Sequence, residues 1–174
     1  MSEGNDGAND GVNDAGTAVA VDYAALTRAI EALWAGERDP VANLANLSAA
    51  VMDAHPALNW AGIYVRRGDE LVVGPFQGKP ACVRIAYGRG VCGTAWAEDA
   101  TQVVADVHAF PGHIACDPAS RSEIVVPMRD ASGVLRAVLD LDSDRPATFG
   151  EADRVGLEAL VATLAPQLDW DALG

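Results

Sequence analysis

In the segment that begins at Asp22, apolar residues recur at steps of three and four, which is the period of an amphipathic helix. A second helix is predicted after Asp39, which is placed to cap it, with Pro40 in its first turn. His55 and Pro56 mark its end. The apolar stripes are Tyr23, Leu26, Ile30, Leu33 and Trp34 in the first helix, and Val41, Leu44, Leu47 and Val51 in the second.

The middle of the chain changes to short apolar runs with a period of two, which is typical of strands. Turn signals at Arg67-Gly68-Asp69 and Ala131-Ser132-Gly133 predict antiparallel hairpins for the first and the last pair of strands. A final helix is opened by the capping-box pattern from Thr148 to Glu151, with Leu157, Leu160, Val161 and Leu164 on its inner stripe. The expected strands are 59–66, 70–76, 81–87, 102–106, 123–129 and 134–142.

Alternation in the last strand separates an apolar face of the sheet from a more polar one. Asp140 and Asp142 lie on the polar face, about 7 Å apart at a rise of about 3.3 Å per residue. In the first strand Trp60, Gly62 and Tyr64 share a face, and a glycine between two aromatic residues predicts a depression. The residues expected to point toward the helices are Leu135, Ala137, Leu139 and Leu141.

These elements predict the α+β class, with one antiparallel sheet of about six strands and the N-terminal and C-terminal helices packed on one face. The length of 174 residues, half of them hydrophobic, suits a single domain with a sizeable core. Residues 1–21 repeat Asn-Asp at a four-residue spacing among glycines, so we predict a disordered tail. The folded domain is then expected at 22–170.

Charge and hydropathy exclude two classes of partner. Twelve basic residues against 25 acidic ones give a net charge of −13, which repels nucleic acid and an anionic membrane surface. No apolar run approaches the about 18 residues needed to span a bilayer, and the amino terminus lacks the features of a signal peptide. We therefore expect a cytoplasmic protein that binds neither nucleic acid nor membrane.

The three cysteines, Cys82, Cys92 and Cys116, are too few and too odd in number for the disulfide framework of a secreted domain. Cys116 belongs to a loop, 108–117, that places two histidines, a thiol and an acid within ten residues; the alternative is an exposed loop with an incidental cysteine. Cys92 stands at the start of a short helix, which favours its thiolate. Cys82 alternates within an expected strand and is typical of a buried small residue.

A zinc site is the other use for these thiols, because His113 and Cys116 with Cys82 and Cys92 supply four ligands. Structural zinc sites generally use two close pairs, whereas nine residues separate Cys82 from Cys92. The spacing therefore argues against zinc, and we predict no metal site.

Several longer motifs, taken together and in order, carry a resemblance that no single one would carry. They are Asn59 to Tyr64, Gly74 to Cys82, Gly88 to Thr94, Asp106 to Asp117, Ser120 to Pro127 and Leu139 to Ser143. In this combination the chain resembles the free methionine-(R)-sulfoxide reductases, a family of GAF-domain enzymes. The match spans most of residues 22–168 and implies a GAF-like domain with a substrate pocket on the face of the sheet opposite the helices.

The resemblance implies a thiol mechanism. Cys116 would attack the sulfoxide sulfur and keep a sulfenic acid when methionine leaves. Cys82 would resolve it, with Cys92 as an auxiliary or second resolver, so a disulfide between Cys82 and Cys116 is expected. Thioredoxin would reduce that disulfide by thiol exchange, and no cofactor would be needed.

Substrate residues also follow from the resemblance. Glu123, Asp140 and Asp142 match an acidic cluster that would hold the α-ammonium of free L-methionine (R)-sulfoxide and supply a proton to its oxygen. Trp60 and Tyr64 would receive the methyl end of the substrate. Taken by themselves, the two aspartates are better explained by a solvated strand face.

Two alternatives from another functional class remain at this point, since a fold does not fix a function. One is a GAF domain that senses a small ligand without catalysis, and the other is a thiol redox sensor. Sensors usually adjoin an output domain, and about 20 residues before the domain leave no room for one, so we favour the enzyme. The sequence is compatible with a homodimer and does not determine the oligomeric state.

Overall fold

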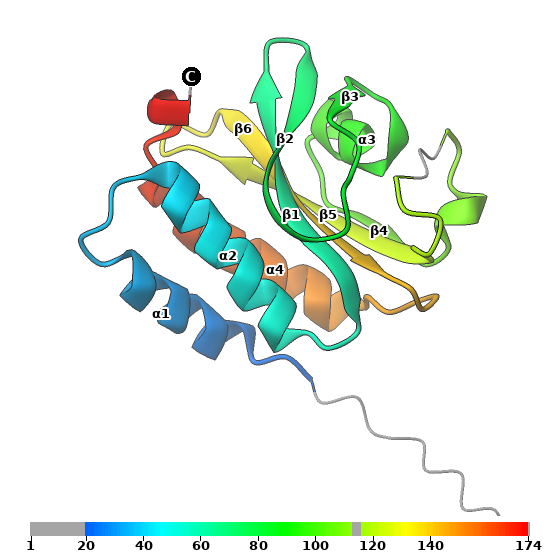
Figure 1. Cartoon of the computed structure of the whole chain (residues 1–174), viewed down its shortest axis with the longest axis horizontal. Helices are drawn as coiled ribbons and strands as arrows, with labels where there is room; N and C mark the ends of the chain where they lie inside the picture. Colours follow the sequence, from blue (N-terminus) through cyan, green and yellow to red (C-terminus); the bar gives the residue numbers. More distant parts are fainter. Residues whose placement is uncertain (1–19, 113–115, 174) are drawn as a thin grey trace, which may run out of the picture.

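The computed structural model describes residues 20–112 and 116–173 and contains one six-stranded sheet in the order β3-β2-β1-β6-β5-β4, shown in Figure 1. All neighbouring strands are antiparallel. The predicted α+β class and the strand number are therefore confirmed. The strands are β1 (Leu58–Arg67), β2 (Glu70–Gly78), β3 (Arg84–Ala86), β4 (Gln102–Val104), β5 (Ser122–Arg129) and β6 (Leu135–Ser143).

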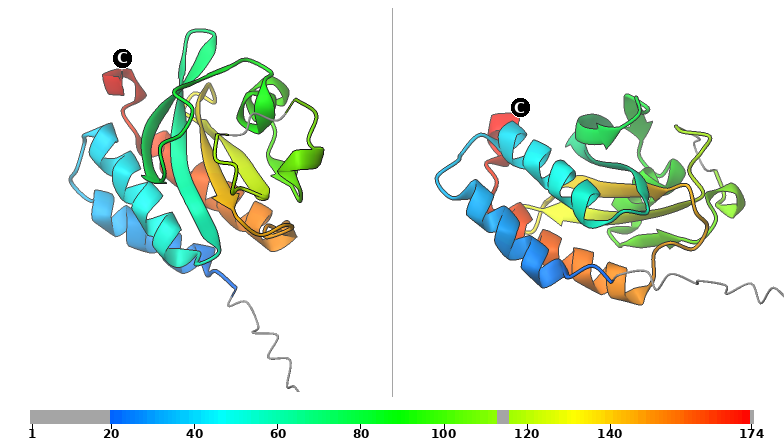
Figure 2. Two further views of the ribbon diagram at one scale, coloured as in Figure 1. Left: turned by 45° about the vertical axis from the view of Figure 1, so that its right-hand side comes forward. Right: turned by 60° about the horizontal axis from the view of Figure 1, so that its bottom comes forward.

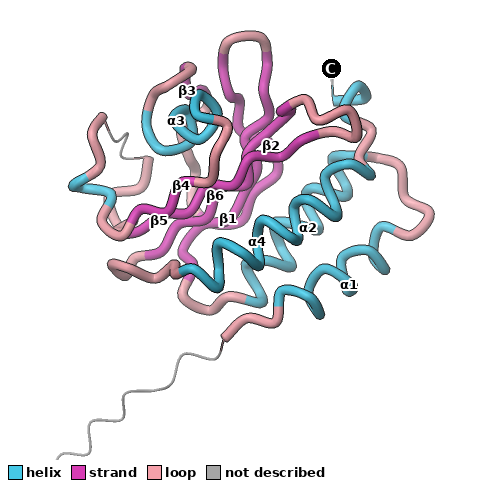
Figure 3. Tube along the Cα trace, turned by 180° about the vertical axis from the view of Figure 1, so that it is seen from behind, coloured by secondary structure: helices cyan, strands magenta, loops and turns pink. Residues whose placement is uncertain are grey.

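The helices lie on both sides of this sheet (Figure 2). Helices α2 and α4 pack against one face, and α1 lies outside them, against both (Figure 3). Helix α3 packs on the other face, against β5 and β6. The α-helices are α1 (Tyr23–Trp34), α2 (Pro40–Ala54), α3 (Gly90–Glu98) and α4 (Glu151–Leu164), and the short 3-10 helices are η1 (Val107–Ala109), η2 (Ala165–Gln167) and η3 (Trp170–Leu173).

Each face of the sheet has its own hydrophobic cluster. The larger one lies between the sheet and the three helices, where Ile63, Leu139 and Leu157 are fully buried. The smaller one lies beneath α3 and includes Trp60 and Tyr64. Because β1 and β6 are central and covered on both faces, their side chains lie in ordered surroundings on the α3 side as well.

Two of the three predicted helix starts are confirmed. Asp22 caps α1 by accepting a hydrogen bond from the Ala25 amide, and Asp39 caps α2. The third was misplaced, because α4 begins after Gly150 and not after Thr148. Asp153 accepts from the Gly150 amide at 2.8 Å and closes the first turn, while the Thr148 hydroxyl donates to Ser143 Oγ.

The apolar stripes of α1 and α2 are narrower than predicted. Leu33 is 56% exposed and Val41 is 52% exposed. At about 100° per residue, each lies about 80° from the centre of the buried face of its helix. Both side chains therefore project past the edge of the packed layer.

Two strand expectations were also wrong. The strand expected at 81–87 is confined to Arg84–Ala86, so Cys82 lies in the preceding loop, half-buried. Leu135 belongs to the cluster under α3 and not to the helix-packed core. The register between β5 and β6 shifts between Met128 and Arg129, because Arg136 is an extra residue in β6. Such a bulge of one residue moves the next side chain, that of Leu135, to the other face of the sheet.

Candidate active site

The three predicted acidic residues lie together on the face of the sheet that α3 covers. Asp142 of β6 pairs with Glu123 of β5 on one side and with Trp60 of β1 on the other. Asp140 precedes it by two residues, so its side chain points to the same face. Glu123 and Asp140 are only 6% and 5% exposed, which excludes the solvated strand face as their environment.

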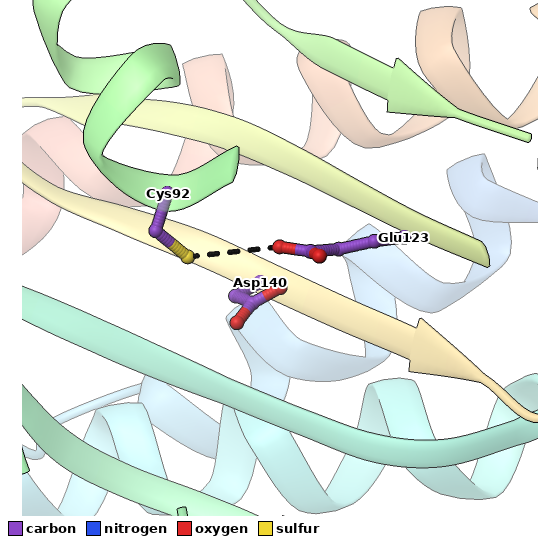
Figure 4. Close-up of side chains that lie close together, drawn as sticks. All are labelled: Cys92, Glu123 and Asp140. Carbon is purple, nitrogen blue, oxygen red and sulfur yellow. Dashed lines mark hydrogen bonds between the residues drawn. The ribbon is translucent and has the colours of Figure 1, made fainter. Parts of the chain in front are cut away.

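Helix α3 brings a thiol to these carboxylates. The sulfur of Cys92, in the first turn of α3, lies 3.9 Å from Glu123 Oε1 and donates a hydrogen bond to it (Figure 4). One potential ligand atom from each of Cys92, Glu123 and Asp140 falls within 4.8 Å of the other two. The three residues, from α3, β5 and β6, thus form a compact buried set.

Burial controls the ionisation of this set. It raises the pKa of Glu123 and of Asp142 well above the usual range, and it raises the pKa of Asp140 to about 7. Burial and the neighbouring carboxyl groups also raise the pKa of Cys92. The thiolate expected for Cys92 at a helix start is therefore wrong, because loss of solvation beside acidic groups outweighs the helix dipole.

Aromatic rings form another part of the site. The Trp60 ring stacks on Tyr64 and on Phe76, with centroid distances of 5.9 and 5.4 Å. The depression expected at Gly62 is filled by that ring, since a Cβ atom at Gly62 would lie 2.4 Å from Trp60 Cη2. The glycine therefore makes room for Trp60 and not for a ligand.

A disulfide joins Cys82 to Cys116, with a Cα–Cα distance of 5.4 Å. This is the pair that the resemblance implies. The same two loops are joined by an ion pair between Lys79 Nζ and Asp117 Oδ2 at 3.3 Å, and Tyr64 donates its hydroxyl hydrogen to the Cys82 carbonyl. The disulfide uses two of the thiols that the zinc alternative requires, and His113 lies outside the described residues.

These features line one cavity. Of the eight residues proposed from the sequence, seven line it, and Cys82 is attached to it through Cys116. Among the described residues the lining has four carboxylates and no lysine, arginine or histidine, so it is suited to a cation. The lining residues are Trp60, Tyr64, Pro80, Ala81, Ile85, Gly90, Val91, Cys92, Cys116, Asp117, Ser120, Glu123, Asp140 and Asp142.

Comparison with known proteins agrees with this geometry. Residues 41–169 match the GAF domain family. The free methionine-R-sulfoxide reductase of Escherichia coli (strain K12) is 52% identical over 142 residues, which are 82% of this chain and 86% of that protein. The chain belongs to the GAF-domain family of free methionine-R-sulfoxide reductases.

Other members of this family support the assignment. The free methionine-R-sulfoxide reductase of Saccharomyces cerevisiae is 44% identical over 142 residues, covering 78% of this chain and 79% of that one. The structure of the free methionine-R-sulfoxide reductase from Neisseria meningitidis, in complex with its substrate, matches with a TM-score of 0.80 at 47% identity, covering 86% and 89% of the two chains. The fold of this family is therefore that of the present chain.

One residue of this GAF-family site was missed from the sequence. Ser120 is buried in the cavity wall and interacts with the Asp142 carboxyl group. It lies in a motif that carried the resemblance, 120–127, so that signal was present. A serine in a loop gives no local indication that it faces a cavity, whereas Asp117, which also lines the cavity and accepts from the Ala119 amide, is the acid of the candidate loop 108–117.

Proposed function

We propose that this chain reduces free L-methionine (R)-sulfoxide to methionine, with Cys116 as the nucleophile and Cys82 as the main resolving thiol. The observation that carries the proposal is the Cys82–Cys116 disulfide at a cavity with acidic and aromatic linings. A sensor of a small ligand needs no redox-active pair there. The named activity of the relatives supports the same reaction.

The first step transfers oxygen from substrate to enzyme. The Cys116 thiolate attacks the sulfoxide sulfur and the oxygen accepts a proton. The hydroxyl group then bonds to the Cys116 sulfur while the bonds of the substrate sulfur to oxygen and to Cys116 break, so methionine leaves and Cys116 keeps a sulfenic acid. In the second step the Cys82 sulfur attacks that sulfenic acid, water leaves and the disulfide forms. The sulfoxide has then been reduced by two electrons, and two thiols have been oxidised to one disulfide.

The acidic cluster has two tasks in this mechanism. Ionised carboxylates bind the α-ammonium of the free amino acid, and a protonated one supplies the proton for the oxygen. Because burial raises the pKa of Asp140 to about 7 and that of Glu123 well above its usual range, the cluster holds both forms near neutral pH. Trp60 and Tyr64 receive the methyl end of the substrate.

Cys92 has a secondary role in this proposal. Its thiol is buried, bonded to Glu123, and its pKa is raised, so it is a poorer nucleophile than the loop thiol of Cys82. We retain it as an auxiliary resolver that acts when Cys82 is absent.

Thioredoxin is the proposed reductant, acting by thiol exchange on the disulfide, and no further cofactor is required. This assigns the enzyme to a reducing compartment, the cytoplasm. Among the described residues, no helix has the length and apolar character to cross a membrane.

Cysteine variants test the chemistry in a single turnover. Without recycling reductant, the reduced wild-type enzyme is expected to yield one equivalent of methionine per chain. Cys116→Ser is expected to yield none, whereas Cys82→Ser keeps the first turnover, and its sulfenic acid persists long enough for dimedone to label it before the slower Cys92 thiol resolves it. Cys92→Ser is the matched control and should retain both the first turnover and the disulfide. Normal turnover by Cys116→Ser would refute the mechanism.

Three substrates test recognition. Free R-sulfoxide should react well, whereas free S-sulfoxide and peptide-bound sulfoxide should react poorly, because a peptide lacks the free ammonium and the buried carboxylates would remain unpaired. The ratio of kcat/KM values is the measurement. Equal values for all three substrates would show that the acidic cluster takes no part in substrate recognition. Tight binding of methionine sulfoxide without turnover would favour a sensor.

A further inference from the structure

The set formed by Cys92, Glu123 and Asp140 has the composition and size of a metal-binding site. For a tetrahedral ion with a metal–sulfur distance of about 2.3 Å and metal–oxygen distances of about 2.1 Å, a sulfur and an oxygen ligand are about 3.6 Å apart. Cys92 Sγ and Glu123 Oε1 are 3.9 Å apart, and the three potential ligand atoms lie within 4.8 Å of one another. Small side-chain rotations therefore suffice to bring them to ligand geometry.

An independent observation points to a positively charged ligand. Asp140 is 5% exposed, and its Oδ1 atom is buried without a hydrogen bond from any described residue. A buried carboxylate oxygen normally has a donor or a cation as its partner. The cavity wall offers no basic side chain among the described residues, so no cationic side chain there pairs with Asp140, whose hydrogen-bonding neighbours, Cys92 and Glu123, are the other two members of the set.

The thiol selects the kind of ion. Mg²⁺ and Ca²⁺ require six or more oxygen ligands, whereas Zn²⁺ accepts one thiolate and two carboxylates with a fourth position left open. On binding, the Cys92 thiol becomes a thiolate, and its proton passes to solvent. Binding of the ion does not require the disulfide to be reduced, because Cys92 is not part of it and stays available when Cys82 and Cys116 are oxidised.

We propose that Cys92, Glu123 and Asp140 bind a Zn²⁺ ion that competes with substrate for the acidic cluster. The ion is an inhibitor and not a cofactor, since it would occupy the carboxylates that the proposed function assigns to the substrate ammonium. Only the competition rests on that function; the binding of the ion rests on the three side chains.

Cobalt titration of the disulfide form tests the site while Cys92 carries the one free thiol. Untagged full-length protein, oxidised at Cys82 and Cys116, is titrated with Co²⁺, whose bond to a thiolate gives a charge-transfer absorption in the near ultraviolet. One equivalent of Co²⁺ per chain with this band is expected, displaced by Zn²⁺ but not by Mg²⁺ in large excess. Absence of the band would overturn the proposal.

Variants locate the ion. Cys92→Ser should abolish the band and Asp140→Asn should weaken Co²⁺ affinity by more than about tenfold. The double variant Cys82→Ser/Cys116→Ser is the matched control and should keep the band. A band that survives Cys92→Ser, or that is lost only in the double variant, would overturn the assignment. Circular dichroism shows whether each variant is folded. If a variant is unfolded, the titration of the wild-type protein still tests whether the ion binds.

Competition separates this proposal from the proposed function. Free methionine sulfoxide should raise the apparent Kd for Co²⁺ in the oxidised protein, where no turnover occurs. If Co²⁺ binds through Cys92 and the sulfoxide has no effect, the ion site stands and the competition is refuted. If the reduced enzyme turns over but the oxidised protein shows no band, the ion site is refuted and the proposed function stands.

Discussion

Gly62 and Trp60 show how a single backbone position shapes the site. The Trp60 ring lies over Gly62, its Nε1 donates to the Lys79 carbonyl at 3.1 Å, and the ring also stacks on Phe76. Only a residue without a side chain allows the ring to lie flat in this position. The aromatic wall of the cavity therefore depends on a glycine that does not line it.

Gly62→Ser is expected to displace Trp60. The new Cβ atom would meet Trp60 Cη2 at 2.4 Å and Phe76 Cβ at 2.5 Å, and such overpacking costs about 1 to 3 kcal/mol. We expect Tm to fall by about 3 to 10 °C and KM for the free R-sulfoxide to rise.

Gly150→Ser makes the same chemical change where the nearest atom would be 4.0 Å away, so it should leave both values nearly unchanged. Equal effects of the two substitutions on Tm and KM would contradict the packing argument.

Ionisation of Asp140 destabilises the folded state, because burial raises its pKa. Its pKa rises from an unfolded value of about 4 to about 7, so between these values the native state binds more protons than the unfolded state. Its contribution to stability is therefore present at low pH and is lost as pH rises through 7. His55 acts in the opposite direction, because burial lowers its pKa.

Asp140→Asn is expected to raise Tm at pH 8 and to reduce the difference in Tm between pH 5.5 and pH 8. The amide has a similar shape and does not ionise, so the cost of a buried charge disappears, a gain of about 1 to 3 kcal/mol. Thermal unfolding in EDTA measures the effect. Comparison of variant with wild type cancels the contribution of His55, and a variant less stable than wild type at pH 8 would contradict the prediction.

At the scale of elements, Asp153 joins helices that are far apart in sequence. Its Oδ1 accepts the Tyr23 hydroxyl hydrogen from α1 at 2.8 Å, and its Oδ2 accepts the Gly150 amide hydrogen at the start of α4. The Tyr23 ring packs against Gly156, where a Cβ atom would lie 2.1 Å from the ring. The cap of α4 is thus also the contact that fixes α1 on the helical layer.

Asp153→Ala and Tyr23→Phe separate the two functions of this contact. Tyr23→Phe removes one hydrogen bond and keeps the ring, so we expect a loss of about 1 kcal/mol in the free energy of unfolding. Asp153→Ala removes the cap as well and should cost about 2 to 3 kcal/mol. Urea unfolding measures both. Equal losses would show that the Gly150 amide gains nothing from Asp153.

At the scale of the whole molecule, the sheet separates stability from chemistry. The helices α1, α2 and α4 bury the larger cluster on one face, and the cavity with its unfavourable buried carboxyl groups lies on the other. The disulfide is on the cavity side and closes a loop between residues 34 apart. In the proposed function this bond breaks and reforms in each cycle, so the domain must stay folded in both states.

Reduction of the disulfide is expected to lower Tm without unfolding the domain at 25 °C. Loop closure over this separation stabilises by at most about 4 kcal/mol, which corresponds to about 8 to 16 °C in a domain of this size. Thermal scans with and without dithiothreitol measure the shift. Cys116→Ser should show no dependence on dithiothreitol, whereas Cys92→Ser should show the full shift. Loss of structure on reduction at 25 °C would contradict the prediction.

Features that depend on neighbours along the chain can be predicted from the amino-acid sequence. The period of the apolar residues indicates the helices and most strands, and Asp22 and Asp39 mark two helix starts because a cap acts within one turn. Alternation placed Asp140 and Asp142 on one face, and the motifs of the family indicated the pairing of Cys82 with Cys116.

Other features depend on contacts between segments that are distant in the sequence. The bulge at Arg136 moved Leu135 to the other face, which only the pairing with β5 reveals. The Trp60 ring filled the space at Gly62, and the side chains of β5 and β6 beside Cys92 changed a helix-start thiol into one with a raised pKa. Desolvation and charge act through space, so the ionisation of Cys92, Glu123 and Asp140 follows from the fold and not from local sequence.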